Sequence, residues 1–134
     1  MTEFHSQAGD GENLIEAVAV VCGPDLSVTL CGGTHYHVGA VALGIPRQSL
    51  KDSEEPAASV SVLCVTGHKE DDLARQAAHR FSCRFGCRVS VTAGIHIDGA
   101  SGEQIKLLLG NCEVVINDIE QKMKAFQKSC PQDD

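Results

Sequence analysis

Tryptophan is absent from the chain, and aromatic side chains make up only 4% of its 134 residues. Proteins that hold single-stranded nucleic acids stack the bases on aromatic side chains, so a binder of that class is not expected. Positive charge is also scarce, because 11 Lys and Arg oppose 18 Asp and Glu and the formal net charge is −7. Since general nucleic-acid binders present a basic surface, we expect no nucleic-acid partner.

Long hydrophobic runs are missing as well. No apolar run reaches the roughly 18–20 residues that a transmembrane helix needs. The first 13 residues, MTEFHSQAGDGEN, are polar and have no apolar centre of the kind found in secretory signals. We therefore expect a soluble, cytoplasmic protein with no membrane partner and with reduced cysteines.

The seven cysteines are an odd number and form no CxxC pair. A structural zinc site needs about four ligands, so none is expected. Cys22, Cys31 and Cys64 lie in or at the end of strand-like apolar runs, and we expect them to be buried as small hydrophobic side chains.

The length and the balance of 43% apolar and 22% charged residues are typical of one globular domain with one core. Residues 1–13 are expected to form a flexible lead-in and residues 129–134 a frayed tail. The single domain between them, residues 14–128, should contain all of the regular structure.

Hydrophobic patterning predicts five strands and two helices within that domain. The expected strands are residues 14–22, 25–31, 37–45, 59–65 and 88–93, and the expected helices are residues 69–85 and 101–126. Gly23 and Pro24 supply the turn between the first two strands. Pro46, which has no N–H to donate, is expected to end the third strand.

Both helices carry start signals, and the first also carries a stop signal. Glu70 and Asp71 fall in the first turn of the first helix, where the helix dipole favours negative charge, and Gly86 is placed to end it. Ser101 and Gln104 form a capping box at the start of the second helix. The stripe residues expected to face the sheet are Leu73, Ala77 and Phe81 in the first helix and Ile105, Leu109, Cys112 and Ile116 in the second.

This order of elements predicts an α+β fold. An antiparallel strand meander is followed by a strand–helix–strand crossover between residues 59 and 93, whose two strands should pair in parallel. The two long helices should pack on one sheet face. Because the other face then stays uncovered, we expect a homodimer that covers it.

Three glycine-flanked loops carry histidines, and we expect these loops to meet in one site. His35 and His37 follow Gly32-Gly33, His68 follows Gly67 at a helix start, and His96 lies between Gly94 and Gly99. Two of the loops follow the strands of the crossover unit, and ligands of open α/β sheets bind at such carboxyl ends.

The residue types in these loops suggest a phosphate-bearing ligand. Lys69 at a helix N-terminus and Arg47 are suited to hold phosphate. Aspartates would oppose that anion unless a divalent cation bridges them. The metal ligands expected on this view are His37, His68, Asp71, His96 and Asp98.

An enzyme is not expected, since the sequence has no recognisable nucleophile–base pair, G-x-S-x-G elbow or Walker A loop. Two alternatives remain open from the residues alone. One is a metal-dependent hydrolase that uses the same His and Asp loops to activate a water molecule. The other is a pure protein-interaction module or assembly chaperone that binds no small molecule.

Three segments resemble the motifs of the prenylated-flavin chaperone family, which includes the small D subunit (LpdD) that accompanies gallate decarboxylase. Residues 31–47 resemble its "HIGAV…PR" segment, residues 65–75 its "GHK-D" segment and residues 94–98 its "GIHID" segment. The motifs occur in the expected order, and the resemblance spans roughly residues 14–123.

This resemblance implies a fold like that of proteasome assembly chaperones and a non-catalytic role. The family binds prenylated FMN and delivers it to the catalytic subunit of a UbiD-type decarboxylase, of the gallate or hydroxybenzoate decarboxylase type. Small residues such as Gly39, Ala40 and Ala42 would let a flat ring approach the backbone. The residues expected to hold the flavin are His37, Gly39, Arg47, His68, Lys69 and His96, whereas His35 lies outside the shared motifs.

Overall fold

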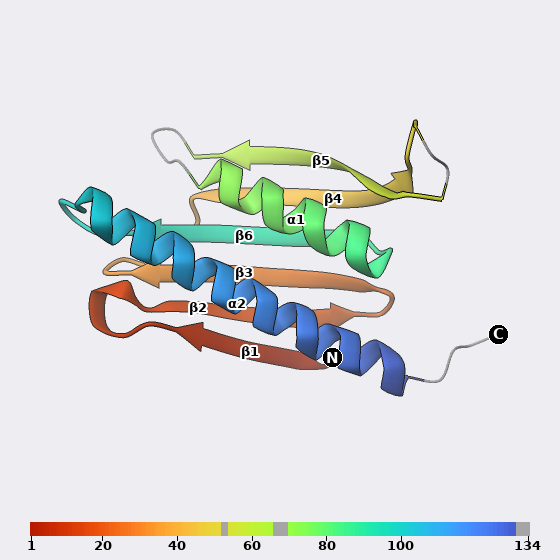
Figure 1. The fold of residues 1–134 in the computed structure, drawn as a ribbon, viewed down its shortest axis with the longest axis horizontal. Helices are drawn as coiled ribbons and strands as arrows, with labels where there is room; N and C mark the ends of the chain where they lie inside the picture. Colours follow the sequence, from red (N-terminus) through yellow and green to blue (C-terminus); the bar gives the residue numbers. More distant parts are fainter. Residues whose placement is uncertain (52–53, 66–69, 131–134) are drawn as a thin grey trace.

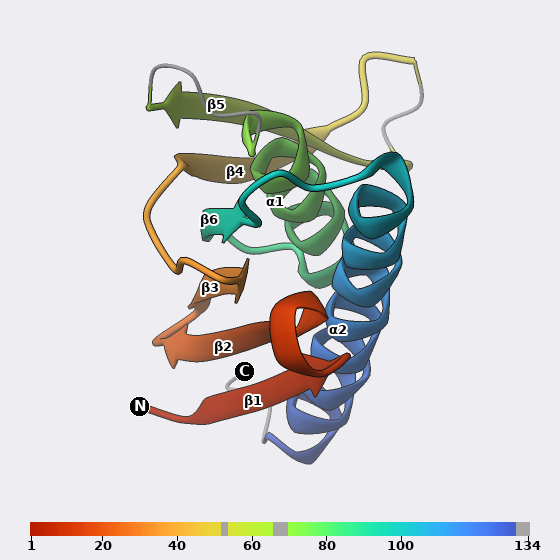
Figure 2. The ribbon, with the colours of Figure 1, turned by 90° about the vertical axis from the view of Figure 1, so that its left-hand side faces the viewer.

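The computed structural model describes residues 1–51, 54–65 and 70–130. Its strands are β1 (Glu3–Ala8), β2 (Ile15–Cys22), β3 (Asp25–Gly33), β4 (Ala40–Gln48), β5 (Pro56–Cys64) and β6 (Val89–His96), its helices are α1 (Asp71–Phe85) and α2 (Gly102–Ser129), and a short 3-10 turn covers Gly11–Asn13. The strands form one mixed sheet in the order β1-β2-β3-β6-β4-β5. Both helices lie on one face of this sheet, and no helix of the described residues covers the other, open face (Figures 1 and 2).

The α+β prediction is confirmed, and the local signals act where the sequence has them. The β2–β3 hairpin closes through Gly23 and Pro24, since Cys22 pairs with Asp25. Ser101 Oγ accepts a hydrogen bond from the Gln104 amide at 3.2 Å, while Gln104 Oε1 accepts one from the Ser101 amide at 3.0 Å. Short-range turn and capping chemistry therefore determines where these elements begin and end.

The strand order differs from the prediction in one place. The expected direct pairing of β5 with β6 is wrong, because β4 lies between them. β6 pairs in parallel with β3 and antiparallel with β4, so it interrupts the expected meander. Val89, Val91 and Ala93 are fully buried, and a central place satisfies the backbone hydrogen bonds of this apolar strand on both sides.

The expected flexible lead-in is also different in the structure. Residues 3–8 form the edge strand β1, which pairs antiparallel with β2 from Glu3↔Val20 to Ala8↔Ile15. Alternate side chains of β1 reach the helix-covered face, where the ring of Phe4 meets that of Phe126 at a centroid distance of 5.6 Å. This burial on one side of the strand explains its order.

Two predicted ends were placed too early. β4 continues through Pro46 to Gln48, since its pairing with β6 stops at Gly44 and Pro46 lies where one side of the strand needs no donor. α2 continues to Ser129, within the expected tail. Residues 131–134 of that tail lie outside the described residues.

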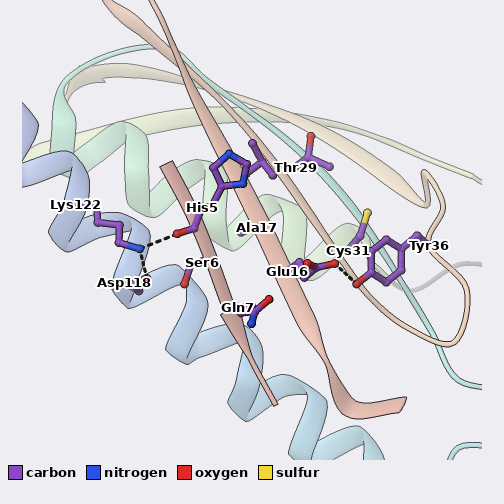
Figure 3. A pocket seen from close by; sticks show the side chains of 11 residues that line it. His5, Ser6, Gln7, Glu16, Ala17, Thr29, Cys31, Tyr36, Asp118 and Lys122 are labelled. Atoms are coloured by element: carbon purple, nitrogen blue, oxygen red, sulfur yellow. Dashed lines mark hydrogen bonds and ion pairs between the residues drawn. The ribbon is translucent and has the colours of Figure 1, made fainter. Parts of the chain in front are cut away.

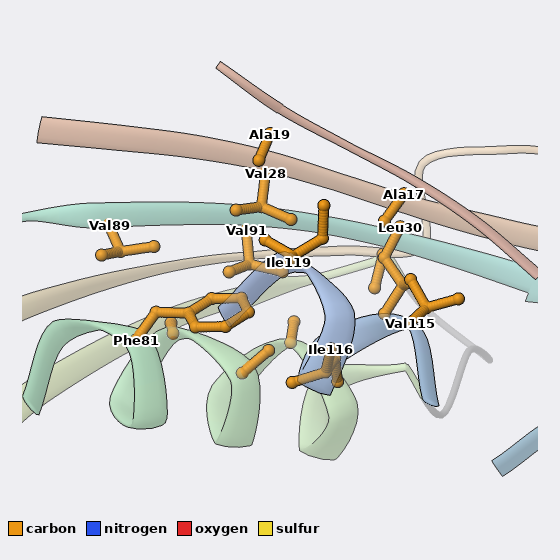
Figure 4. Packing of buried hydrophobic residues seen from close by; sticks show 14 of the residues in the cluster. Ala17, Ala19, Val28, Leu30, Phe81, Val89, Val91, Val115, Ile116 and Ile119 are labelled. Carbon is orange, nitrogen blue, oxygen red and sulfur yellow. The ribbon is translucent and has the colours of Figure 1, made fainter. Parts of the chain in front are cut away.

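The core lies between the sheet and the two helices (Figure 4). Phe81 of α1 and Val115 and Ile119 of α2 are fully buried against the strands. The stripe prediction is right for Ala77, Phe81, Cys112 and Ile116 and wrong for two residues of α2: Ile105 and Leu109 are 49% and 54% exposed. α2 runs diagonally across the sheet, so that its first turns lie away from β1 and β2 (Figure 1).

The cysteine prediction is wrong as well. Cys22 is exposed and Cys31 is half-buried, because strand alternation turns both toward the open face. Cys64 shares the helix-covered side with its partner Ala40 but is exposed at the end of the edge strand β5. Cys87 and Cys112 are the buried ones, and all seven thiols are free. Within the described part of the chain, no helix is long and apolar enough to cross a membrane.

Candidate ligand-binding site

The loop of residues 34–39 lies against the end of β6. The Thr34 amide donates to the His96 carbonyl at 2.7 Å, and the Gly39 amide donates to the Ala93 carbonyl at 2.9 Å. A Cβ atom at position 94 would overlap the His37 carbonyl group, so this approach requires glycine there. The contact brings the histidines of the loop to the histidine that ends β6.

Three histidines and one aspartate meet there, and we call His35, His37, His96 and Asp98 the histidine cluster. The ring centroid of His96 is 5.7 Å from that of His35 and 6.4 Å from that of His37. Asp98 lies 2.7 Å from His96 Nε2 and 3.2 Å from His35 Nε2. These hydrogen bonds, first that of His96 and then that of His35, hold the pKa of Asp98 below its ordinary value.

Glu70 connects the histidine cluster to the protein interior. Its Oε1 lies 2.9 Å from His37 Nε2 and accepts a hydrogen bond from the Ile95 amide at 3.3 Å. Its side chain is 10% exposed and packs against Gly39, where a Cβ atom would come within 2.7 Å of the carboxyl group. Sequence reasoning treated Glu70 as an acid in the first turn of a helix and so missed this role. The available signal was its position directly after Lys69 in a motif segment.

Tyr36 anchors the histidine loop to the open face of the sheet (Figure 3). Its hydroxyl donates a hydrogen bond to Glu16 of β2, and this bond, with burial and the charge of Glu16, raises the pKa of Tyr36 to about 12. Cys31 lies beside the ring, and its thiol points to the His37 carbonyl at 3.7 Å. Sequence reasoning missed both Tyr36 and Glu16, since contact between them depends on the loop path.

An apolar cavity of about 350 Å³ opens on the helix side of Glu70. We call it the α1–α2 cavity; its lining residues are Glu70, Leu73, Ile95, His96, Ile97, Ala100, Ile105, Leu108, Leu109 and Cys112. Two of the lining side chains carry a carboxylate or an imidazole group. His96 belongs to the histidine cluster, and Glu70 contacts His37 of that cluster. One side of the site is therefore polar and the other is hydrocarbon.

The structure brings His37, His96 and Asp98 together, as the sequence predicts, with His35 from the same loop as His37. It adds Glu70, which the sequence did not predict there. His68 and Lys69 lie outside the described residues. Asp71 begins α1 directly after Glu70.

Arg47 is not brought to the cluster. Ala40 begins β4 beside the histidine loop, whereas Arg47 lies near the other end of the strand, roughly 20 Å away at about 3.3 Å per residue. Arg47 donates there to Ser59 Oγ at 2.9 Å and to the Gln48 carbonyl at 3.0 Å. Arg47 therefore does not lie beside the histidine cluster, and its predicted partner on the phosphate, Lys69, lies outside the described residues.

The expected platform of small residues is also different. Ala40 and Ala42 are 1% and 0% exposed and lie on the helix-covered face of β4. The Glu70 carboxyl group occupies the space above Gly39. A flat ring cannot rest on these three residues without displacing α1 or Glu70.

The histidine cluster contains side chains of the types that bind metal ions. Over residues 1–51, 54–65 and 70–130, no group of three His, Cys, Asp or Glu side chains is placed to hold one. The Nε2 atoms of His35 and His96 point to the Asp98 carboxylate, and His37 Nε2 points to Glu70. The described residues therefore do not make a metal site by themselves.

The fold resembles that of a chain in a proteasome assembly chaperone complex. The structure matches a chain from the crystal structure of a chaperone complex for yeast 20S proteasome assembly, with a TM-score of 0.54, 16% sequence identity and coverage of 93% of this chain and 98% of that chain. At this identity the match shows the fold alone. No curated protein sequence matches the chain significantly.

A family match makes the assignment more specific. Residues 9–124 match the family described as the prenylated flavin chaperone LpdD-like domain. The chain therefore belongs to the LpdD-like prenylated flavin chaperone family. The three sequence motifs that carry the resemblance contain His37, Asp71, His96 and Asp98.

Proposed function

We propose that this protein binds prenylated FMN without transforming it and delivers it to the catalytic subunit of a UbiD-type decarboxylase. The family match over residues 9–124 is the observation that carries the proposal. The histidine cluster beside an apolar cavity supports it, because prenylated FMN has both polar and hydrocarbon parts. The residues proposed to orient the flavin are His37 and His96, with Asp98 and Glu70 fixing their rings.

The phosphate of the flavin is proposed to lie toward residues 67–69, where Lys69 precedes α1. The N-terminus of a helix favours an anion through its free amide groups and its dipole. This part of the proposal comes from the sequence, since these residues lie outside the described ones.

Binding and delivery are tested in two steps. The protein, purified after coexpression with a flavin prenyltransferase, is expected to carry a flavin absorption band. Mixed with an apo-decarboxylase, it is expected to restore decarboxylase activity faster than an equal amount of free prenylated FMN does.

His96→Asn is expected to weaken flavin binding about tenfold, since it removes one of the two proposed orienting rings. His79→Asn is the matched control, because His79 is an exposed histidine of α1 that lies outside the histidine cluster. Absence of any bound flavin in the wild-type protein would overturn the proposed function. Equal flavin affinity in the two variants would show that His96 of the histidine cluster does not contribute to flavin binding.

A divalent cation stays a prediction from the sequence, with His68 and Asp71 as the candidate ligands beyond the described cluster. Titrating prenylated FMN against wild type and Asp98→Ala, each with and without chelator, tests it. A bridging cation predicts weaker binding in Asp98→Ala and in chelator. Direct repulsion between Asp98 and the phosphate predicts tighter binding in Asp98→Ala and no chelator effect.

The proposed assembly is a homodimer formed through the open face. Val41, Leu43 and Ile45 of β4 and Leu63 of β5 present exposed apolar side chains there, with Leu63 81% exposed. Apolar patches of this kind mark interaction surfaces. In sedimentation velocity, Leu43→Glu is expected to give a monomer, and Leu107→Glu on the outer side of α2 is expected to leave the dimer intact; a wild-type monomer would contradict the proposal.

A further inference from the structure

The first turns of α2 carry apolar side chains that the protein itself does not bury. Ile105 and Leu109 belong by helical spacing to the same inner stripe as Cys112 and Ile116, which are 1% and 7% exposed. Ile105 and Leu109 are nevertheless about half exposed, and both line the α1–α2 cavity. The sequence pattern therefore predicts that these two side chains are buried, but no part of the folded chain covers them.

The cavity continues between the helices. A second hollow of about 570 Å³ shares Leu73, Ile105, Leu109 and Cys112 with the first. Its far end is closed by Arg80, which forms ion pairs with Glu113 at 2.8 Å and with Glu120 at 3.2 Å. The groove is therefore apolar along its floor, and its far end carries charged side chains that are already paired with one another.

The opposite end of the groove is the one that meets the histidine cluster. Glu70 lines the cavity and contacts His37, and His96 lines the cavity and contacts Asp98. A ligand that enters from the cluster thus reaches hydrocarbon walls with its leading end, while its polar end stays among the histidines.

We infer that the α1–α2 cavity receives the hydrocarbon, prenyl-derived end of the flavin and so distinguishes prenylated FMN from FMN. The inference rests on the proposed function and adds the element of the fold that selects the ligand. FMN has the same phosphate, ribityl chain and flavin ring as the prenylated form, so the histidines and the anion site cannot separate the two. Only an apolar wall favours the extra hydrocarbon, because burying it removes it from water.

The test compares the two ligands on three proteins. The double variant Ile105→Gln, Leu109→Gln makes the cavity mouth polar at two side chains that are already half exposed, so the fold should be kept. Leu107→Gln is the matched control, since Leu107 is also 49% exposed on α2 but does not line either hollow. Each protein is titrated with prenylated FMN and with FMN, and binding is followed by flavin fluorescence in the absence of oxygen.

Wild type and Leu107→Gln are expected to bind prenylated FMN at least about tenfold more tightly than FMN. A hydrophobic pocket gains about tenfold or more in affinity for each additional methylene group that it buries. The double variant is expected to lose most of this preference by binding prenylated FMN more weakly, with its FMN affinity unchanged. A preference that survives in the double variant would overturn the inference and leave the proposed function standing. A wild type that binds neither flavin would overturn both.

Discussion

The environment of α2 changes near Gly110, and we call residues 102–110 its first half and residues 111–129 its second half. In the second half, Val115, Ile116, Ile119 and Met123 are no more than 7% exposed and complete the core. In the first half, Ile105, Leu107 and Leu109 are about half exposed, and only Leu108 is less than 10% exposed. The same helix therefore stabilises the fold at one end and borders the candidate ligand-binding site at the other.

The difference follows from what each half lies against. The second half is held to α1 by Arg80, whose guanidinium bonds Glu113, Glu120 and Asn117 of α2. The first half faces the α1–α2 cavity instead of a strand. Stability and binding are thus expected to respond to substitutions in different halves, and the following predictions test that separation.

The largest expected effect is on stability in the second half. Ile119 is fully buried, so Ile119→Ala should lower the free energy of unfolding by about 2–5 kcal/mol through lost burial and the cavity left behind. Val114→Ala, at a side chain that is 55% exposed on the same helix, should change it by less than about 0.5 kcal/mol. Urea unfolding measures both, and equal losses would contradict the division of α2.

The next effect concerns the link between the helices. Arg80→Leu should lower the free energy of unfolding at neutral pH by about 1.5–3 kcal/mol, because Glu120, 8% exposed, loses its main charged partner. Solvent screens part of this, since the Arg80 side chain is 31% exposed. Arg75→Leu is the control, because Arg75 is an exposed arginine of α1 away from this network.

The same link gives a pH signature. Burial alone would raise the pKa of Glu120, but the hydrogen bond from Arg80 and the charges of Arg80, Lys124 and Arg84 lower it overall. A carboxylate with a lowered pKa stabilises the fold above its ordinary pKa of 4.5 and loses this contribution as the pH falls through its value in the folded protein. The gap in stability between wild type and Arg80→Leu should therefore narrow in acid; a constant gap would contradict the assignment.

A matched pair of glycines compares the site with the helix surface. Gly94→Ala should cost about 1–3 kcal/mol and weaken flavin binding, since its Cβ atom would push the His37 backbone away from β6. Gly110→Ala in α2 should instead raise the free energy of unfolding by about 0.5–1 kcal/mol and leave flavin binding unchanged. Its Cβ atom meets nothing within 4 Å, and alanine has a higher helix propensity than glycine. Thermal unfolding and flavin titration measure both; unchanged binding in Gly94→Ala would separate that backbone contact from the site.

The smallest effect is local to the histidine loop. Tyr36 is the only tyrosine and the chain has no tryptophan, so alkaline tyrosinate absorbance reports on this one side chain. Tyr36 should ionise near pH 12, and Glu16→Gln should move its pKa back toward the ordinary value of 10. Coincident titration curves for the two proteins would show that Glu16 does not hold the loop in solution.

Residues close in sequence predicted much of the fold correctly. The Ser101–Gln104 capping box, the Gly23–Pro24 turn and the left-handed Gly86 at the end of α1 each act over a few residues, and each is found where the pattern placed it. The alternation in residues 3–8 was also present in the sequence, but it was outweighed by the polar composition around it.

The site was only partly visible from the sequence. The motif glycines and histidines pointed to the contact between residues 34–39 and 94–98, which the structure contains. Glu70 could equally have been a solvent-facing acid at a helix start, and Arg47 a cluster residue. The positions of these two side chains depend on how α1 packs against the sheet and on how far β4 extends.

The sequence by itself determined the helices, the hairpin and the family motifs, because capping, turn geometry and periodic burial depend on neighbours within about one helical turn or a few strand residues. Only the tertiary structure decided that β6 lies between β3 and β4, that Glu70 faces His37, and that the first turns of α2 border a cavity. Strand order is a choice among pairings that local preferences leave nearly equal, and burial of Val89, Val91 and Ala93 at the centre of the sheet favours the observed one.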